Sequence, residues 1–301
     1  MTFMTHEALL AMIEEGLQAA VPAEKAHYAR GHTPAPLAEA MRYSLLSGGK
    51  RLRPALLLRT VEMLGGDLRE ALAPACALEM IHTYALIHDD LPSMDDDDLR
   101  RGRPTNHKVF GEGIAVLAGD GLLNAAYELM LRNALIHPVN LSRHVAAIEA
   151  IARCAGVFGM IAGQCLDMLS EGTAGDESLL GYIHMHKTAS LFTAPLMAGG
   201  LLCGADAGRL SALERYGRGV GLAFQIVDDL LDEEGSAAAM GKATGADARR
   251  NKLTWPGLLG KSAARKKVDQ LWQDAADALL PFGVRAKELM ALADRLITRK
   301  A

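Results

Sequence analysis

Apolar residues recur every three or four positions through most of this chain, which is the spacing of one face of an α-helix. In the first such stretch, Leu9, Leu10, Ile13 and Leu17 form a single stripe. Glycine and proline mark where the stretches end or begin. The pattern predicts helices over residues 5–20, 35–46, 72–91, 113–134 and 141–169, another whose first turn contains Pro54, and two amphipathic helices within residues 263–299.

The composition favours an all-α protein. Alanine and leucine dominate the periodic stretches, and aromatic residues make up only 5% of the sequence, which favours helix over sheet. With 301 residues, of which 50% are hydrophobic, the chain can bury a large core and is at the upper limit for one domain. No linker interrupts it. We therefore predict a single domain over residues 1–301.

Charge and cysteine usage narrow the class of protein. The net charge of −4 argues against nucleic-acid binding, and no apolar run approaches the ~18 residues of a membrane span. Residues 1–15 include acids but neither Arg nor Lys, unlike a signal or transit peptide. The 4 cysteines lack CxxC spacing and lie among apolar residues, which predicts buried, reduced thiols. We expect a cytoplasmic protein without a membrane span.

An acidic run follows the apolar stretch at residues 75–87. Six of the ten residues from Asp89 to Asp98 are aspartates. Pro92 ends the helix, and Asp95 is six residues beyond Asp89, so the chain must unwind after the helix to bring Asp95 back. Taken alone, the run is typical of a solvated loop, but a second acidic group changes this interpretation.

The second acidic group is Asp228, Asp229 and Asp232. Their spacing places three carboxylates on one helical face, with Gln225 one turn earlier. Like charges at this spacing repel, and carboxylates beside the apolar residues around them need a cation. Oxygen ligands without His or Cys favour magnesium, whose remaining positions are filled by water and phosphate. Two such groups facing each other would hold several magnesium ions and a polyphosphate.

Basic residues close to the first acidic run are candidate phosphate ligands. Lys50 and Arg53 follow two glycines that permit a tight turn, and Arg100 and Arg101 follow the run itself. A charged surface turn and simple neutralisation of the aspartates are the alternatives. His82 lies two turns before the first aspartate, on nearly the same face, although a lone histidine in an apolar helix is more often a core residue.

The segments Asp89 to Asp95 and Asp228 to Asp232 resemble the two aspartate-rich motifs of the trans-prenyl diphosphate synthases, and the longer first motif is similar to that of bacterial farnesyl diphosphate synthases. The motifs GGKRLRP, RRGxPTxH, GQxxD, HxxKT and GKxxGxDxxxxKxTYP extend the resemblance over about residues 44–256. Departures are Trp255 in place of tyrosine and an acidic stretch at 233–236. The resemblance implies an all-α helical bundle of the isoprenoid synthase type around a deep central cavity, usually homodimeric.

The resemblance also implies roles for particular residues. For isopentenyl diphosphate it implies Lys50, Arg53, His82 and Arg101. For the allylic diphosphate it implies Arg100, Lys187 and Lys242, the last in a small-residue loop typical of a lid. For about three magnesium ions, which manganese can replace, it implies Asp89, Asp90, Asp95, Asp228, Asp229 and Asp232. Further substrate contacts are expected at Gln164, Thr188, Gln225 and Lys252. Gln164 in a buried polar pair with Asp167, and Thr188 as a helix cap, are the alternatives.

The implied reaction begins with ionisation of an allylic diphosphate. Magnesium and basic side chains stabilise the departing diphosphate. Isopentenyl diphosphate then attacks the allylic cation beside an apolar cavity, and the product loses a proton to the released diphosphate. No protein nucleophile is required, in agreement with the lack of a Ser–His or Cys–His arrangement. The implied substrates are isopentenyl, dimethylallyl and geranyl diphosphate, and the product is (2E,6E)-farnesyl diphosphate.

Product length depends on the helix before the first motif. Tyr84 is the only aromatic residue there and lies five residues before Asp89, roughly 7.5 Å along the axis. A large aromatic at this position resembles the floor that stops elongation at fifteen carbons. We therefore expect farnesyl rather than geranylgeranyl diphosphate. Ordinary core packing of Tyr84 is the alternative, and the small Ala85 beside it shows that the region is not uniformly bulky.

Other classes of protein fit less well. An EF-hand loop starting at Asp97 fails because Arg101 and Lys108 stand at ligand positions. Glu-x-x-His motifs at Glu24 and Glu79 are typical of di-metal carboxylate bundles but leave the aspartates unused. A terpene cyclase needs no second diphosphate site, and a non-catalytic regulatory subunit needs no complete aspartate motifs. Geranylgeranyl diphosphate synthase is the alternative within the family.

Overall fold

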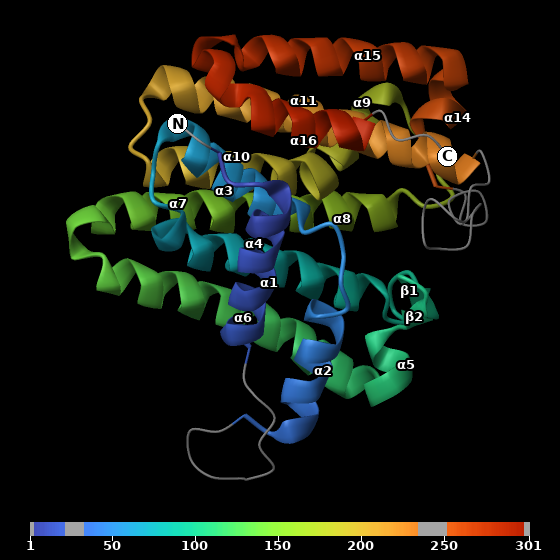
Figure 1. Ribbon diagram of the computed structural model, residues 1–301. Helices are drawn as coiled ribbons and strands as arrows, with labels where there is room; N and C mark the ends of the chain where they lie inside the picture. Colours follow the sequence, from blue (N-terminus) through green and yellow to red (C-terminus); the bar gives the residue numbers. More distant parts are fainter. Residues whose placement is uncertain (1–2, 22–32, 234–251, 298–301) are drawn as a thin grey trace. The chain divides into compact units, whose positions relative to one another are not determined.

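The computed structural model describes residues 3–21, 33–233 and 252–297, and these ranges form helices and one short hairpin (Figure 1). The chain separates into two compact units. Unit 1 comprises Met1–Leu58 and Asp67–Ile148, and unit 2 comprises Arg59–Gly66 and Glu149–Ala301. The all-α prediction is confirmed. The single domain and the central cavity stay predictions.

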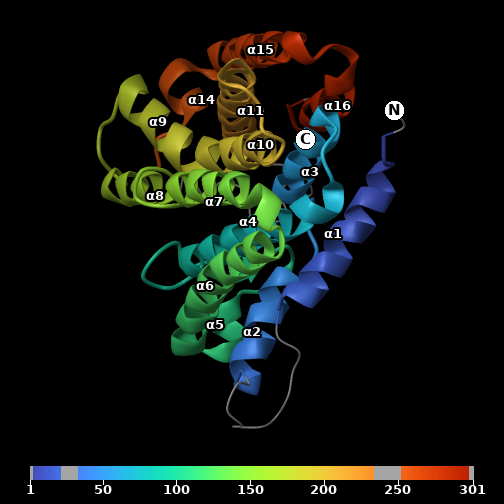
Figure 2. The ribbon, with the colours of Figure 1, turned by 90° about the vertical axis from the view of Figure 1, so that its left-hand side faces the viewer.

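Unit 1 is built on two helices that pack along each other, α4 (Leu68–Asp89) and α6 (Glu112–Ile136). Figure 2 shows α2 and α5 beside α6. The other elements are α1 (His6–Ala20), α2 (Ala35–Leu45), β1 (Leu99–Arg100), β2 (Arg103–Pro104), α5 (Asn106–Phe110), η1 (Pro138–Asn140), and the first parts of α3 (Leu52–Leu64) and α7 (Leu141–Ala155). The predicted stripe of α1 is buried at Leu9, Ile13 and Leu17, and α1 packs on α4.

Helix α4 begins one turn earlier than the apolar pattern predicts. Asp67 caps it, because its side chain accepts a hydrogen bond from the amide of Arg69 at 2.8 Å. Leu68, Ala71, Leu72 and Ala75 already have helical spacing, so the prediction placed the start of this helix one turn too late. Pro74 lies inside the helix without ending it.

Unit 2 is centred on α11 (Ala207–Glu233), which packs against α10 (Ser190–Leu202) and α15 (Lys261–Ala278). The other elements are α8 (Met160–Leu169), α9 (Glu177–His184), η2 (Met185–Ala189), α14 (Trp255–Leu259), η3 (Leu280–Ala286), α16 (Lys287–Ile297), and the second parts of α3 and α7. Leu222, Ile226, Leu230 and Trp255 belong to one buried apolar cluster, which fixes the helix that carries the second aspartate group. The prediction of two amphipathic C-terminal helices is confirmed by α15 and α16.

The single helix predicted over residues 141–169 is wrong. Helix α7 ends at Ala155 and α8 begins at Met160, with Gly156 and Gly159 between them. A Cβ on Gly159 would run into the carbonyl oxygen of Cys154, so the backbone can make this break only with glycine. The apolar periodicity continues across the break and therefore gave no sign of it.

Cysteine burial was predicted for all four thiols. None of the four forms a disulfide in the described part of the chain, and Cys76 is buried. Cys165 is exposed, so the prediction is wrong for this residue. Its helix, α8, buries Met160 and Gly163, and Cys165 lies on another face. The apolar neighbours of Cys165 in sequence did not determine which face is covered.

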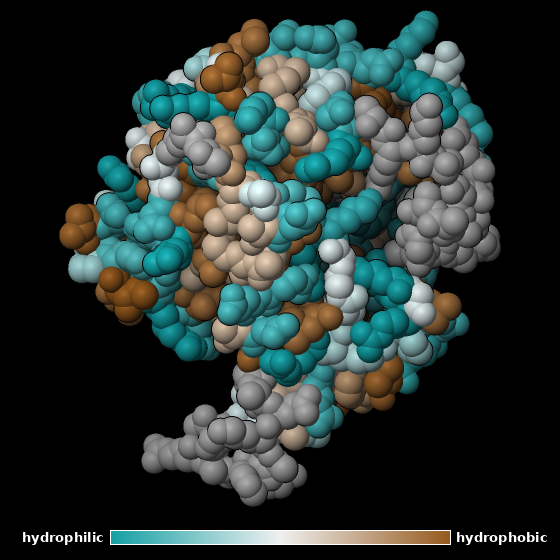
Figure 3. All heavy atoms as spheres, viewed as in Figure 1, coloured by the Kyte–Doolittle hydropathy of each residue, from teal (hydrophilic) through white to brown (hydrophobic). Residues whose placement is uncertain are grey.

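Two stretches, Glu112–Ile136 and Pro138–Leu169, are long and apolar enough to cross a membrane by length and composition. This is weak evidence, because core helices of other proteins pass the same test. Apolar side chains protrude where α6 ends, with Leu135 72%, Ile136 73% and Val139 94% exposed. In Figure 3, apolar atoms protrude at the left-hand edge, which is the side where α6 ends in Figure 1. Unit 1 therefore has an uncovered apolar face on α6 and η1.

Candidate active site

The first aspartate group lies where α4 ends. The helix stops at Asp89, and the chain turns back so that the amide of Asp95 donates to the carbonyl of Asp89 at 2.8 Å. The amide of Asp96 donates to the carbonyl of Leu91 at 3.1 Å in the same turn. The predicted unwinding is confirmed. Asp89 and Asp95, six positions apart, are neighbours with half-buried side chains.

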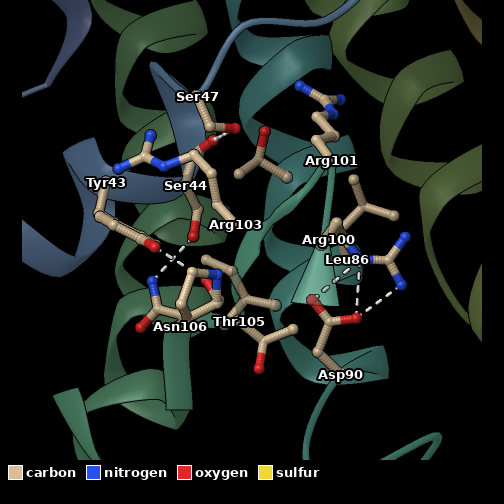
Figure 4. A pocket seen from close by; sticks show the side chains of 13 residues that line it. Tyr43, Ser44, Ser47, Leu86, Asp90, Arg100, Arg101, Arg103, Thr105 and Asn106 are labelled. Carbon is tan, nitrogen blue, oxygen red and sulfur yellow. Dashed lines mark hydrogen bonds and ion pairs between the residues drawn. The ribbon is translucent and has the colours of Figure 1, made fainter. Parts of the chain in front are cut away.

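Asp90 forms a two-pronged ion pair with Arg100 of β1 (Figure 4). The Nε atom of Arg100 is 2.7 Å from Oδ1 of Asp90, and Nη2 is 2.6 Å from the same oxygen. Burial alone would lower the pKa of Arg100, but its hydrogen bond to Asp90 and the nearby carboxylates raise it. Asp90 is only 3% exposed. Arg100 thus already lies against the first motif, and its role toward the allylic diphosphate stays a prediction.

A hairpin between β1 and β2 directs Arg101 towards the glycine turn before α3. Arg101 and Gly102 both have positive φ, 54° and 74°, as tight hairpin turns require. Nη1 of Arg101 donates to the carbonyl of Gly48. A Cβ on Gly49 would occupy the position of the Arg101 guanidinium. Two segments that the resemblance assigns to one substrate are therefore adjacent in unit 1.

A pocket in unit 1 is enclosed by α2, α4 and this hairpin (Figure 4). It is lined by Tyr43, Ser44, Ser47, Thr83, Leu86, Ile87, Asp90, Arg100, Arg101, Arg103, Pro104, Thr105 and Asn106. The Asn106 amide donates to the hydroxyl of Ser44 at 2.8 Å, and the Tyr43 hydroxyl donates to the carbonyl of Pro104 at 2.8 Å. Tyr43, Ser44 and Ser47 were not among the site residues predicted from the sequence. Their helical spacing directly before the glycine turn was the available signal.

The basic residues of unit 1 strengthen one another's preference for an anion. Burial is the largest cause that lowers the pKa of Arg53, to about 10; Glu79 raises it and Arg101 lowers it. Burial, followed by the charges of Arg53 and other arginines, lowers the pKa of His82 well below its ordinary value. His82 is therefore neutral, and an incoming diphosphate would meet cations that repel each other. Lys50 is exposed.

Arg51 has a structural role in the same segment. It is 2% exposed and pairs with Glu14 at 2.6 Å and with Glu79 at 3.0 Å. This pairing uses the glutamate of one Glu-x-x-His motif, which weakens the di-metal alternative. The other motif, at Glu24, lies outside the described residues. The omission of Arg51 from the predicted ligands agrees with its burial.

Tyr84 is 6% exposed on α4. Burial, and after it the neighbouring Tyr127 of α6 and Asp89, raise the pKa of Tyr84 to about 12. Its ring meets His88 edge to face with centroids 5.7 Å apart. Ala85 is half-buried. The phenol therefore lies in the α4–α6 interface and close enough to Asp89 to be affected by its charge.

In unit 2, the predicted cation Lys187 lies on η2, a π-helical turn of the kind often found at functional sites. Its Nζ is 2.5 Å from Oδ2 of Asp167, and Nζ of Lys252 is 3.5 Å from the same oxygen. Burial would raise the pKa of Asp167, but the two lysines lower it overall. Asp167 therefore positions two predicted ligands and pairs with them rather than with Gln164. Its place in the GQxxD motif was the missed signal.

Asp229 is held by neutral hydrogen-bond donors. The Gln225 amide donates to Oδ1 at 3.0 Å, and the backbone amide of Trp255 donates to Oδ2 at 3.1 Å. Thr188 donates to the side-chain oxygen of Gln225 at 2.8 Å, so it is part of this network rather than a cap. Asp229 and Asp232 are 3% and 5% exposed, whereas Asp228 is half-buried. Asp228 is thus the most accessible carboxylate of the second group.

His184, which was not among the predicted site residues, joins the same network. The indole N–H of Trp255 donates to Nδ1 of His184 at 2.9 Å. Burial lowers the pKa of His184 to about 3; Asp167 raises it and Lys187 lowers it. The histidine is therefore a neutral acceptor. Trp255, which is 1% exposed, supplies the donor.

The predicted site residues are divided between the two units. Gln164 is half-buried on α8, where Gly163 lets the helix approach the backbone of Lys187 closely. Lys242, Glu234 and Ser236 lie outside the described residues. The structure gathers the first aspartate group and the isopentenyl diphosphate residues in unit 1, and Lys187, Lys252, Gln225 and the second aspartate group in unit 2. The roles assigned to these residues stay predictions.

Comparisons with known proteins give one consistent family. The protein-family model described as polyprenyl synthetase matches residues 34–278 of this chain. The chain is 50% identical over 258 residues to farnesyl diphosphate synthase of Geobacillus stearothermophilus, covering 85% of this chain and 86% of that protein. It is 46% identical over 272 residues to geranylgeranyl pyrophosphate synthase 11 of Arabidopsis thaliana, covering 88% and 75%.

Solved structures agree with this result. An FPP/GFPP synthase from Zymomonas mobilis has a TM-score of 0.80 and 35% identity, covering 96% of this chain and 99% of that chain. A geranyltransferase from Legionella pneumophila has a TM-score of 0.79 and 32% identity, covering 98% and 94%.

Proposed function

Since the chain belongs to the polyprenyl synthetase family, we propose that it joins isopentenyl diphosphate to dimethylallyl and geranyl diphosphates and forms (2E,6E)-farnesyl diphosphate. The observation that carries the proposal is the turn after α4, where Asp95 returns to Asp89 and Arg100 meets Asp90. The 50% identity to a farnesyl diphosphate synthase supports the same product. The charged and hydrogen-bonding side chains gathered at this turn suit transfer by ionisation of a diphosphate.

Isopentenyl diphosphate is bound by the basic residues of unit 1. Arg53 and Arg101 carry the charge, and neutral His82 donates a hydrogen bond to a phosphate oxygen. The mutual repulsion of the arginines falls when a diphosphate enters, so binding is favoured. Lys50 is exposed and contributes from the rim.

The residues that we expect to bind the allylic diphosphate belong to both units. Each aspartate group offers carboxylate oxygens of its own, Asp89 and Asp95 in unit 1 and Asp228 in unit 2. Such oxygens fit magnesium, which would supply Lewis-acid stabilisation of the departing diphosphate when bound. Lys187 is paired with Asp167, and Arg100 is paired with Asp90. When the substrate binds, each cation exchanges its carboxylate partner for a phosphate oxygen and stabilises the negative charge that develops on the leaving diphosphate.

Geranylgeranyl diphosphate is the second candidate product, because a geranylgeranyl pyrophosphate synthase is 46% identical. The buried phenol of Tyr84 favours the shorter product, since it occupies the α4–α6 interface below Asp89. Incubation with isopentenyl and dimethylallyl diphosphates plus magnesium, with products resolved by chain length, tests the proposal. Fifteen-carbon product is expected. Activity that survives chelation, or twenty-carbon product alone, contradicts it.

We further propose that the protein is a homodimer and is cytoplasmic. The exposed apolar side chains on α6 and η1 form a face that a second copy would cover: Val116, Leu117, Leu131, Leu135, Ile136 and Val139. The lack of disulfides among the described cysteines agrees with a reducing compartment. Light scattering of wild type and Leu131→Glu tests the dimer: the wild type should have twice the mass of one chain, and the variant should dissociate.

A further inference from the structure

A compact cluster of one glutamate and two histidines lies in unit 1 at the opposite end of α4 from the aspartates. Glu70 is in the first turn of α4, His137 follows the last residue of α6, and His144 is on α7. One possible ligand atom from each residue lies within 4.8 Å of the others. Glu70 and Asp89 are nineteen residues apart on one helix, which separates the cluster from the first motif by roughly 28 Å.

Hydrogen bonds and ring stacking fix the positions of both histidines, and His137 has the orientation that a metal ligand needs. Nδ1 of His137 is 2.8 Å from the carbonyl oxygen of Asn133. Because a carbonyl only accepts, Nδ1 carries the proton and the lone pair is on Nε2. Nε2 of His144 donates to Oε1 of Glu70 at 2.8 Å. This hydrogen bond joins two of the proposed ligands, and a bound ion would replace it. The two rings stack with centroids 5.3 Å apart. A hydrogen bond such as that from His137 to Asn133 commonly orients a metal-binding histidine.

Hydrogen bonds also fix the position of Glu70. The Asn140 amide donates to Oε1 of Glu70 at 2.9 Å, and the Asn133 amide donates to the Glu70 carbonyl at 2.9 Å. Partial burial would raise the pKa of Glu70, but hydrogen bonds from His144 and Asn140 lower it overall. The group is therefore an anion at neutral pH. Its side chain is 21% exposed and that of His144 only 1%, so a bound ion would be reached by solvent from the glutamate side.

We propose that Glu70, His137 and His144 bind a divalent transition-metal ion, with zinc as the best fit, at a site separate from the aspartate groups. Two imidazoles and one carboxylate are a common zinc ligand set, with water in the fourth position. Bonds of about 2.0–2.1 Å place the ligand atoms roughly 3.3 Å apart, so a small movement of half-buried His137 closes the site. Nitrogen ligands disfavour magnesium.

Occupation would connect three elements of unit 1. The ion would join the start of α4 to the end of α6 and to α7 through side chains already in contact. Since the bound form contains interactions absent from the unfolded chain, zinc should stabilise the fold. It has no part in the proposed transfer reaction, which uses the other end of α4.

Zinc binding can be measured by dialysis against zinc with excess magnesium, followed by metal analysis. Wild type should retain one zinc ion per chain more than His137→Gln or His144→Gln, and should gain melting temperature that these variants do not. His6→Gln, a histidine variant on α1 outside the cluster, should behave as wild type. Equal zinc content in wild type and both cluster variants overturns the proposal.

Cobalt distinguishes the ligands without any variant. Cobalt bound to two imidazoles and a carboxylate in a four-coordinate site absorbs strongly in the visible range, whereas cobalt bound by carboxylates and water in an octahedral site absorbs weakly. Strong bands in wild type, displaced by zinc but not by magnesium, are expected. Weak bands alone reject the site even if the histidine variants fail to fold.

Discussion

The two aspartate groups have the same chemistry but are stabilised in different ways. In unit 1, Asp90 is paired directly with Arg100, a cation only ten positions away in sequence. In unit 2, Asp229 is held by the neutral amides of Gln225 and Trp255, and the nearby Lys187 pairs with Asp167 instead. In the first group, an aspartate of the group itself therefore binds the neighbouring cation, Arg100. Near the second group, the cation Lys187 is bound by Asp167, which is not a member of the group.

The carboxylates of the two groups also differ in how far they are exposed. Asp90 and Asp229, which have these contacts, are each 3% exposed, whereas Asp89, Asp95 and Asp228 are half-buried. We expect the three half-buried aspartates to matter most for turnover, and Asp90 and Asp229 to matter for the position of their neighbours.

Removing an accessible carboxylate from either group should have the largest effect. We expect Asp89→Ala and Asp228→Ala each to lower kcat roughly 10²-fold or more, because each removes a ligand for the ion that stabilises the leaving diphosphate. Both variants should fold, since each removes repulsion between like charges. Turnover assays with circular dichroism check this. Asp98→Ala, at an exposed aspartate paired with Lys108 at 2.7 Å, should retain activity; unchanged turnover in Asp89→Ala or Asp228→Ala would refute the metal assignment.

Basic residues of the two units should differ in the substrate they serve. Arg53→Ala is expected to raise KM for isopentenyl diphosphate about tenfold, and Lys187→Ala to raise KM for the allylic diphosphate by a similar factor, because each loses one charge-assisted hydrogen bond. Initial rates with each substrate varied in turn measure both constants. Equal effects of each variant on both substrates would show that the division between units is wrong.

Product length should depend on unit 1 alone. Tyr84→Ala should shift products towards twenty carbons or more and cost about 3–5 kcal/mol in stability, because it leaves a cavity in the α4–α6 interface. Chromatography of the products and denaturant unfolding test both effects. Tyr84→Phe, which keeps the ring, is the control and should still stop at fifteen carbons. A folded, active Tyr84→Ala with unchanged products would locate the floor elsewhere.

The smallest effect concerns the two ion pairs of Asp167 with Lys187 and Lys252 in unit 2, which we call the lysine clamp. The pKa of Asp167 is lowered in the folded protein, so its contribution is present above the ordinary carboxyl value of 3.8 and is lost as pH falls through the lower folded value. Asp167→Asn should be less stable than wild type by about 1–2 kcal/mol near neutral pH. Urea unfolding at several pH values should show this difference shrinking below the ordinary carboxyl pKa.

A control in the same unit is Asp206→Asn, whose exposed pair with Arg209 at 3.6 Å should contribute little. If the difference between wild type and Asp167→Asn stayed constant down to acidic pH, the clamp would not be electrostatic.

The sequence by itself determined most of the helices of unit 1, the two acidic groups and the turn that returns Asp95 to Asp89. These follow from local rules: apolar spacing, a proline that ends a helix, and the fixed geometry of residues four apart. The motif resemblance extended the prediction to the phosphate-binding residues. It also led to a family that the comparisons confirm.

Only the tertiary structure decided which charged residue meets which. It paired Arg51 with Glu14 and Glu79, assigned Lys187 and Lys252 to Asp167, and brought Glu70 to His137 and His144. These partners are far apart in sequence, and apolar periodicity says nothing about which polar side chains meet across packed helices. The break after α7 and the exposure of Cys165 escaped prediction for the same reason, because the covered face of a helix is determined by its neighbours rather than by its own sequence.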